Sequence, residues 1–62
     1  METIKKLGEF LTDDEILEVA EMAVDGLTLD AVLRLQYLLV DKWNISLLQS
    51  REIVFILRKE FE

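Results

Sequence analysis

Apolar residues recur at helical intervals along most of the chain. The spacing predicts three main helices over residues 13–25, 29–43 and 47–61, each with an apolar side that can be buried. Before them, Ile4, Leu7 and Phe10 keep the same spacing around Gly8, which favours a short, frayed N-terminal helix. The short connections force consecutive helices into contact. We therefore expect an all-α fold: a compact bundle of three main helices plus a short N-terminal helix, forming one domain over residues 1–62.

Polar residues mark where the helices are expected to begin. Thr12 and Glu15 have the spacing of a capping box, in which each side chain accepts a hydrogen bond from the backbone amide of the other residue. Ser46 and Gln49 repeat this pattern before the last helix. Thr28 is the expected cap of the middle helix. These positions predict helix starts at residues 13, 29 and 47.

Two further residues indicate where helices end. Gly26 can adopt the left-handed backbone conformation that commonly follows a helix, and the apolar Leu27 comes next. Asn44 can adopt the same conformation and is expected to end the middle helix after Trp43. Both connections are then only two or three residues long, which lies within the usual range for loops between packed helices, about 2–8 residues.

The first main helix separates into an apolar and an acidic face. Its expected core residues are Ile16, Val19, Ala20, Ala23 and Val24. Its acidic face carries Asp14, Glu18, Glu21 and Asp25. No basic residue occurs between Glu9 and Asp30. The simplest interpretation is a solvated face that keeps an apolar protein in solution. The functional interpretation is a docking face for a basic partner, and a mimic of DNA phosphates is the third.

The other two main helices carry more apolar surface than one small fold can bury. The apolar arc of the middle helix is roughly 220° wide, against about 100° for a helix with one buried side. Its narrow polar arc includes Asp30 and Arg34, which are spaced to form an ion pair. The last helix has an expected core stripe of Leu47, Ser50, Ile53, Val54, Leu57 and Phe61. The surplus defines a candidate apolar association surface: Leu29, Leu33, Tyr37, Leu48, Phe55 and Ile56. A homodimer would cover it, and a different protein partner is the alternative.

Composition excludes several classes of function. The chain contains no Cys and no His, so it forms no disulfide and lacks the two commonest zinc ligands. No Gly-rich phosphate loop and no Cys or His nucleophile–base arrangement occurs, so we expect neither an enzyme nor a cofactor or metal. The net charge of −6 disfavours binding to nucleic acid or anionic lipid.

The apolar runs are short. The longest spans residues 53–57, far below the roughly 18 residues of a membrane-spanning helix. The N-terminal residues lack the apolar stretch of a signal peptide. We therefore expect no membrane association and a cytoplasmic location.

The segment from the first into the middle helix resembles a helix-turn-helix motif. The resemblance covers about 20 residues, the size of that two-helix unit. It rests on the turn Gly26-Leu27-Thr28 and on Val32 and Leu35, which occupy the inward positions of the second helix. The sequence departs from the motif at Met22, where a small residue is usual, and at Asp25, where an apolar one is usual. The implied recognition helix would present Thr28, Leu29, Asp30, Leu33, Arg34 and Tyr37. One basic residue beside an acidic helix disfavours direct DNA binding.

These patterns together predict a small protein–protein interaction module. It would be an adaptor, an accessory subunit or an inhibitor of a larger protein, and it would self-associate. Small inhibitors encoded by phages or plasmids share this build, which is an analogy rather than an inference from residues. The alternative is a nucleic-acid-linked regulator, either a degenerate helix-turn-helix protein or a DNA-phosphate mimic.

Overall fold

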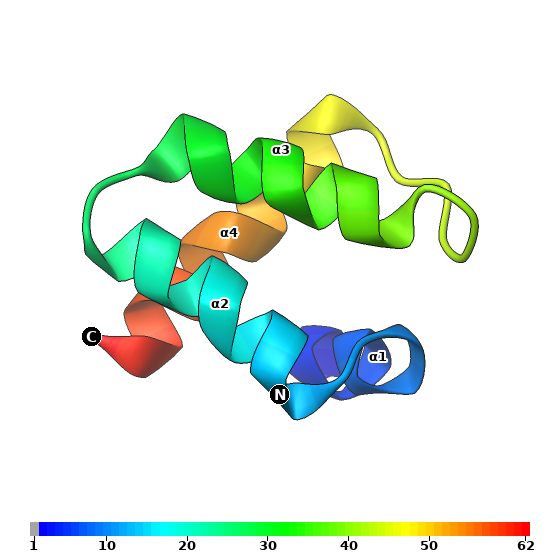
Figure 1. The fold of residues 1–62 in the computed structure, drawn as a ribbon, viewed down its shortest axis with the longest axis horizontal. Coiled ribbons are helices and arrows are strands. Elements are labelled where there is room, and N and C mark those ends of the chain that lie inside the picture. Colours follow the sequence, from blue (N-terminus) through cyan, green and yellow to red (C-terminus); the bar gives the residue numbers. More distant parts are fainter. Residues whose placement is uncertain (1) are drawn as a thin grey trace.

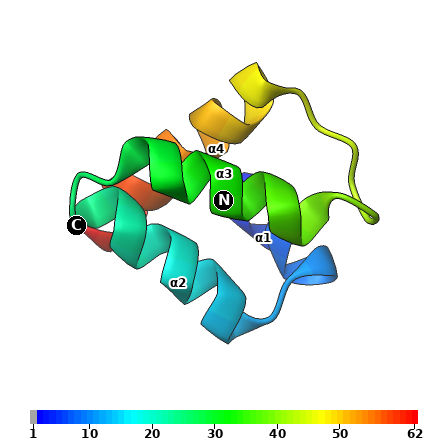
Figure 2. The ribbon, with the colours of Figure 1, turned by 45° about the horizontal axis from the view of Figure 1, so that its top comes forward.

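Four helices make up the fold in a computed structural model, which describes residues 2–62. They are α1 (Glu2–Phe10), α2 (Asp13–Val24), α3 (Thr28–Leu39) and α4 (Leu47–Phe61). In Figure 1, α2 and α3 lie side by side, and α4 crosses behind them and contacts both. Figure 2 shows the same layering after rotation, with α1 beside the start of α2. The all-helical class predicted from the sequence is confirmed.

The core lies where α2, α3 and α4 meet, and α1 contributes to it through Leu7. Four leucines are almost completely shielded from solvent: Leu7, Leu35, Leu39 and Leu57. Ser50 is the buried polar residue of the described chain, and its hydroxyl donates to the carbonyl oxygen of Ser46 at 3.0 Å. Since this hydroxyl is satisfied within its own helix, it can be buried at little cost.

Both predicted capping boxes are present. Thr12 Oγ1 accepts a hydrogen bond from the Glu15 amide at 3.2 Å, and Glu15 Oε1 accepts one from the Thr12 amide at 2.8 Å. At the start of α4, Ser46 Oγ and the Gln49 amide are 3.1 Å apart, and Gln49 Oε1 and the Ser46 amide are 3.0 Å apart. The predicted starts at residues 13 and 47 are therefore confirmed.

The cap at Thr12 makes part of the stability depend on pH. The hydrogen bond from the Thr12 backbone amide lowers the pKa of the Glu15 carboxyl from its ordinary value of 4.5. A pKa lowered by folding adds stability above the unfolded value, and this stability is lost as pH falls through the folded value. Glu15→Gln keeps an acceptor but does not titrate. We expect the wild type to be the more stable at pH 7, with the gap closing below about pH 4.5, near the reference value for a carboxyl group.

Urea unfolding of the two proteins across pH 2.5–7 measures this gap. The other carboxyls titrate in both proteins, so they cancel in the difference. A gap that stays constant down to the lowest pH would contradict the expectation.

Gly26 ends α2 as predicted, but the start of α3 differs from the prediction. Gly26 has φ +86°, the Leu27 amide donates to the Met22 carbonyl at 2.9 Å, and the Gly26 amide donates to the Ala23 carbonyl at 3.1 Å, which are the two hydrogen bonds of a Schellman motif. Leu27 then occupies the N-cap position of α3, with no side-chain cap, and its carbonyl accepts from the Ala31 amide at 2.9 Å. Thr28 is therefore the first residue of the helix and not its cap. The reason is that Leu27 takes part in both helix ends: its amide bonds to the last turn of α2 and its carbonyl to the first turn of α3. The turn is therefore one residue shorter than predicted.

The end of α3 was also predicted wrongly. The helix ends at Leu39 and not at residue 43, and residues 40–46 form a longer connection than expected. Asn44 does not adopt the left-handed conformation, because no non-glycine residue within 2–62 has a positive φ. The amides of Lys42 and Trp43 both donate to the Leu39 carbonyl, at 2.9 and 3.0 Å. The chain therefore leaves the helix through a single tight turn.

Contacts with α1 and the core explain this early end. The Trp43 ring packs against Phe10 with centroids 5.8 Å apart, and Lys6 Nζ lies 4.5 Å from the Trp43 ring centroid. Lys42 Nζ donates to the Phe10 carbonyl at 3.2 Å. Ile45, two residues after Trp43, is buried in the core. These tertiary contacts outweigh the local helical preference of the segment.

Three predicted core residues lie at helix ends and are exposed. Val24 ends α2, Leu47 begins α4 and Phe61 ends it, with 38%, 60% and 44% of their surface accessible. A helical wheel gives the direction of a side chain around the axis but not its position along the axis. The predicted direction places these residues toward the core, yet at the ends of their helices the neighbouring helices do not cover them.

Candidate interaction surfaces

The structure leaves a broad apolar surface on α3 and α4. Five members of the predicted association surface are exposed, and together they define the α3–α4 surface: Leu29, Leu33, Tyr37, Leu48 and Phe55. The three α3 residues are the most informative, because they follow one another at intervals of four positions and are 53–69% exposed. They form a stripe along the side of α3 that faces away from the core residues Ala31 and Leu35.

Leu29 of this surface lies next to α4 near the start of both helices. A hollow of about 360 Å³ lies between α3 and α4 there, lined by Thr28, Leu29, Val32, Leu47 and Arg51. The Arg51 guanidinium lies 5.5 Å from the ring of Phe55, the geometry of a cation–π contact. The predicted member Ile56 lies elsewhere: it is half-buried and lines a different hollow with Thr3 and Trp43.

The predicted acidic face of α2 is exposed, but its members differ in their contacts. Asp14, Glu18, Glu21 and Asp25 are all exposed. Glu18 Oε1 accepts a hydrogen bond from Arg34 Nε of α3 at 2.7 Å. This bond raises the pKa of the Arg34 guanidinium above its ordinary value. Arg34 therefore pairs with Glu18, and the predicted Asp30–Arg34 pair is wrong because Arg34 reaches across to α2.

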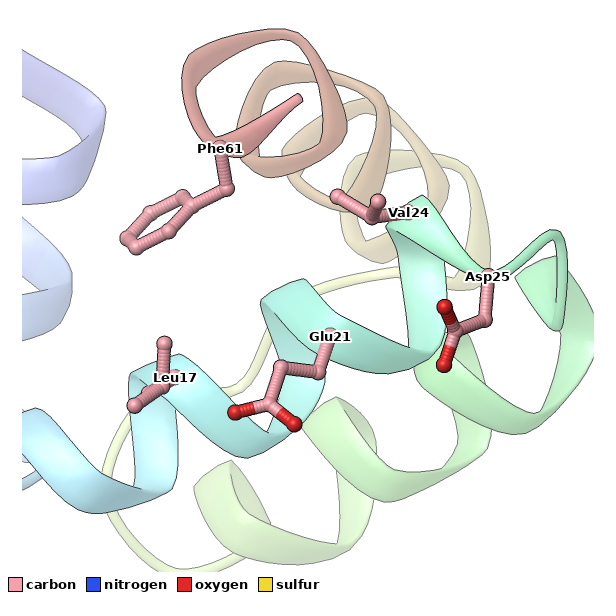
Figure 3. Close-up of a pocket in the computed structure, with 5 residues that line it drawn as sticks. All are labelled: Leu17, Glu21, Val24, Asp25 and Phe61. Atoms are coloured by element: carbon pink, nitrogen blue, oxygen red, sulfur yellow. The ribbon is translucent and has the colours of Figure 1, made fainter.

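Glu21 and Asp25 border a groove that the sequence pattern does not predict. Figure 3 shows the hollow between α2 and the end of α4, with its lining residues Leu17, Glu21, Val24, Asp25 and Phe61. The volume of this hollow is about 180 Å³. A second hollow of about 300 Å³ is lined by Ile4, Asp13, Ile16, Leu17 and Phe61. Since Leu17 and Phe61 line both hollows, we treat them as one feature, the α2–α4 groove. Its sequence signal is the seven-residue interval between Leu17 and Val24, but the sequence pattern places both Val24 and Phe61 in the core.

The described residues show neither a metal site nor a membrane span. Within residues 2–62, no three His, Cys, Asp or Glu side chains are grouped so that they could hold a metal ion. In the same part of the chain, none of the helices has the length and apolar character needed to cross a bilayer. The chain has no significant match among protein-family models, curated proteins or solved structures. A function is therefore argued from the surfaces themselves.

Proposed function

We propose that this protein is a protein–protein interaction module that self-associates through the α3–α4 surface. The observation that carries the proposal is the exposed stripe of Leu29, Leu33 and Tyr37. Large apolar side chains scattered singly over a surface are ordinary, whereas a contiguous set of them marks an interaction site. The stripe borders α4 through Leu29, which lines a hollow together with Leu47, and Leu47 is 60% exposed.

The stripe is suited to pairing with a second copy of itself. Leu29 and Tyr37 lie four positions on either side of Leu33. If two α3 helices pack antiparallel with their Leu33 residues at the two-fold axis, Leu29 of each copy meets Tyr37 of the other. Such an isologous contact closes on itself and gives a dimer instead of a filament.

A fold as small as this one gains much from covering exposed apolar side chains. Burying a large apolar side chain stabilises a protein by about 1.5–3 kcal/mol relative to leaving it exposed. A core of this size supplies only about 3–5 kcal/mol of net stability, and the usual supplement is a disulfide, a metal or a partner chain. The chain has no Cys, so it has no disulfide. Covering the α3–α4 surface would supply the partner-chain contribution.

The alternative function, a nucleic-acid-linked regulator, has less support. Arg34 is the basic residue of α3, and it is paired with Glu18 of the acidic helix α2. A helix that reads DNA needs cations that meet phosphates. Val32 and Leu35 are buried, as the helix-turn-helix resemblance implies, but inward packing of this kind is needed in any tight helical corner.

Sedimentation equilibrium at micromolar concentration tests self-association. We expect a dimer for the wild type and a monomer for Leu33→Glu, because the substitution places two carboxylates at the two-fold axis. Leu33 is 53% exposed, so the variant should keep its helical circular dichroism. Leu17→Glu is the matched control: it makes the same change at an exposed leucine of α2 and should remain dimeric. A monomeric wild type, or a dimeric Leu33→Glu variant, would refute the proposal.

A further inference from the structure

We propose that the α2–α4 groove binds a basic amphipathic helix of a partner protein. The inference extends the proposed function, since it gives the module a second surface for a different protein. It does not require self-association, because Leu17, Val24 and Phe61 are separate from the α3 stripe.

The shape of the groove suits a helix better than a small ligand. Its two hollows share Leu17 and Phe61, and their lining extends from Asp13 at the start of α2 to Asp25 just beyond its end. A helix rises 1.5 Å per residue, so this interval of twelve positions is roughly 18 Å long. About three turns of a partner helix would span it.

The floor of the groove is apolar. Leu17, Val24 and Phe61 are 43%, 38% and 44% exposed, so each presents a substantial face to an incoming side chain. Figure 3 shows Phe61 extending from α4 above α2, with Leu17 and Val24 on the α2 side of the hollow. Leu17 and Val24 lie two helical turns apart. An amphipathic helix with apolar residues at i, i+3 or i+4, and i+7 repeats this spacing and can place its stripe along the floor.

The border of the groove is acidic and lacks cations. Within residues 2–62 the ion pairs are Glu18 with Arg34 and Arg58 with Glu62, so neither Glu21 nor Asp25 takes part in one. Asp25 is the C-cap of α2, at the negative end of the helix dipole, and the last turn of α2 contains no basic residue. A carboxylate at this end is unfavourable for the free protein. A partner's Lys or Arg residues beside the apolar stripe would neutralise Glu21, Asp25 and, at the far end, Asp13.

This charge pattern selects the chemistry of the occupant. Phosphate groups of nucleic acids and anionic lipid surfaces would be repelled by these carboxylates. An apolar floor with an acidic border matches a helix that is apolar on one side and basic at the edges of that side. Opposite charges at the border also fix the register of the helix in the groove and speed its association.

A designed peptide tests the proposal directly. The probe is a fluorescein-labelled helix of leucine, alanine and lysine, with leucines at i, i+3, i+4 and i+7 and lysines beside them. The control peptide has glutamate in place of lysine. Fluorescence anisotropy at low salt should show binding of the lysine peptide and none of the glutamate peptide. The affinity should fall as salt rises, because exposed charges are screened over about 10 Å at 0.1 M ionic strength.

Variants of the protein locate the binding site. Glu21→Lys and Asp25→Lys should each lower the affinity for the lysine peptide by about tenfold, which is the scale of one lost charge pair. Asp41→Lys changes the net charge equally at an exposed position outside the groove and should leave the affinity within about twofold of the wild type, as expected for a distant site. Leu17→Ala should also weaken binding. Asp25→Lys should in addition raise the melting temperature of the free protein, since it places a cation at the end of α2.

The outcomes separate this proposal from self-association. Retained peptide binding by Leu33→Glu would support a groove that acts independently of the α3–α4 surface. Loss of peptide binding in Leu33→Glu would overturn the proposal, because the peptide would then occupy α3 instead. Equal weakening by Asp41→Lys and Glu21→Lys would also overturn it, since net charge alone would explain the binding. No binding of the lysine peptide by the wild type at low salt would contradict it outright.

Discussion

Leu57→Ala is expected to lower the free energy of unfolding by about 2–5 kcal/mol, the range for truncating a fully buried leucine. Leu57 lies in α4, which contacts both α2 and α3, and none of its surface is exposed. Removing its side chain leaves a cavity that the surrounding helices can fill only in part. Since a fold of this size has about 3–5 kcal/mol of stability to lose, the substitution should remove a large share of it and lower the urea midpoint accordingly.

The matched control makes the same substitution on the same helix. Leu48 is 65% exposed, so Leu48→Ala should change the stability of the monomer by less than about 0.5 kcal/mol. Urea unfolding followed by circular dichroism measures both variants. If the α3–α4 surface pairs two copies, the stability lost in Leu48→Ala relative to the wild type should grow with protein concentration. The stability lost in Leu57→Ala should be present at every concentration. Similar losses for both variants at high dilution would mean that the burial pattern of α4 is wrong.

Gly26→Val is expected to lower the free energy of unfolding by about 1–3 kcal/mol, the cost of holding a non-glycine residue in a rarely populated backbone conformation. Gly26 has φ +86°, and an added Cβ would meet no atom within 4 Å. The whole cost therefore arises from the backbone. A branched Cβ resists this conformation more than alanine does, so Gly26→Ala should lose less.

Gly8 provides a control with the opposite sign. It lies inside α1, and an added Cβ would also meet nothing within 4 Å, but its φ is not positive. Gly8→Ala should therefore raise stability by about 0.5–1 kcal/mol, the difference in helix propensity. Thermal unfolding of the two variants beside the wild type measures both effects. A stabilised Gly26→Val variant would show that the Schellman turn does not form.

The predictable parts of the fold are those that a few neighbouring residues determine. Thr12 with Glu15, and Ser46 with Gln49, satisfy backbone amides within a four-residue window, so the starts of α2 and α4 could be predicted from the sequence. The turn at Gly26 is equally local, because it requires only a residue that tolerates a positive φ.

The end of α3 depends on residues far away in the sequence. The apolar pattern continues to Trp43, but this side chain packs against Phe10, which lies more than thirty positions earlier. No local pattern shows that the helix must stop at Leu39 to allow this contact. The assignment of Arg34 failed for a related reason: Asp30 is the obvious partner within the helix, yet Glu18 of α2 is the one that Arg34 reaches.

The candidate surfaces divide in the same way. The stripe on α3 could be predicted from the sequence. One side of this helix already carries enough apolar residues to form its buried face, so the large apolar residues on the opposite side remain exposed. The α2–α4 groove could not, because it depends on where α4 ends relative to α2. Phe61 has the direction of a core residue, and only its position at the last turn of α4 brings it over Leu17 and Val24 instead.

The packing of Trp43 has a consequence for how this protein can be observed. It is the only tryptophan of the chain, and its indole ring contacts Phe10 and Lys6 of α1 although it belongs to the connection after α3. Helix α1 contributes a single buried residue, Leu7, and so has the fewest contacts to break in a local opening. Release of α1 would expose the indole to water and shift its emission to longer wavelength while α2, α3 and α4 remain folded. The intrinsic fluorescence of this chain thus reports on the docking of its first helix, whereas circular dichroism reports on the helix content of the whole chain.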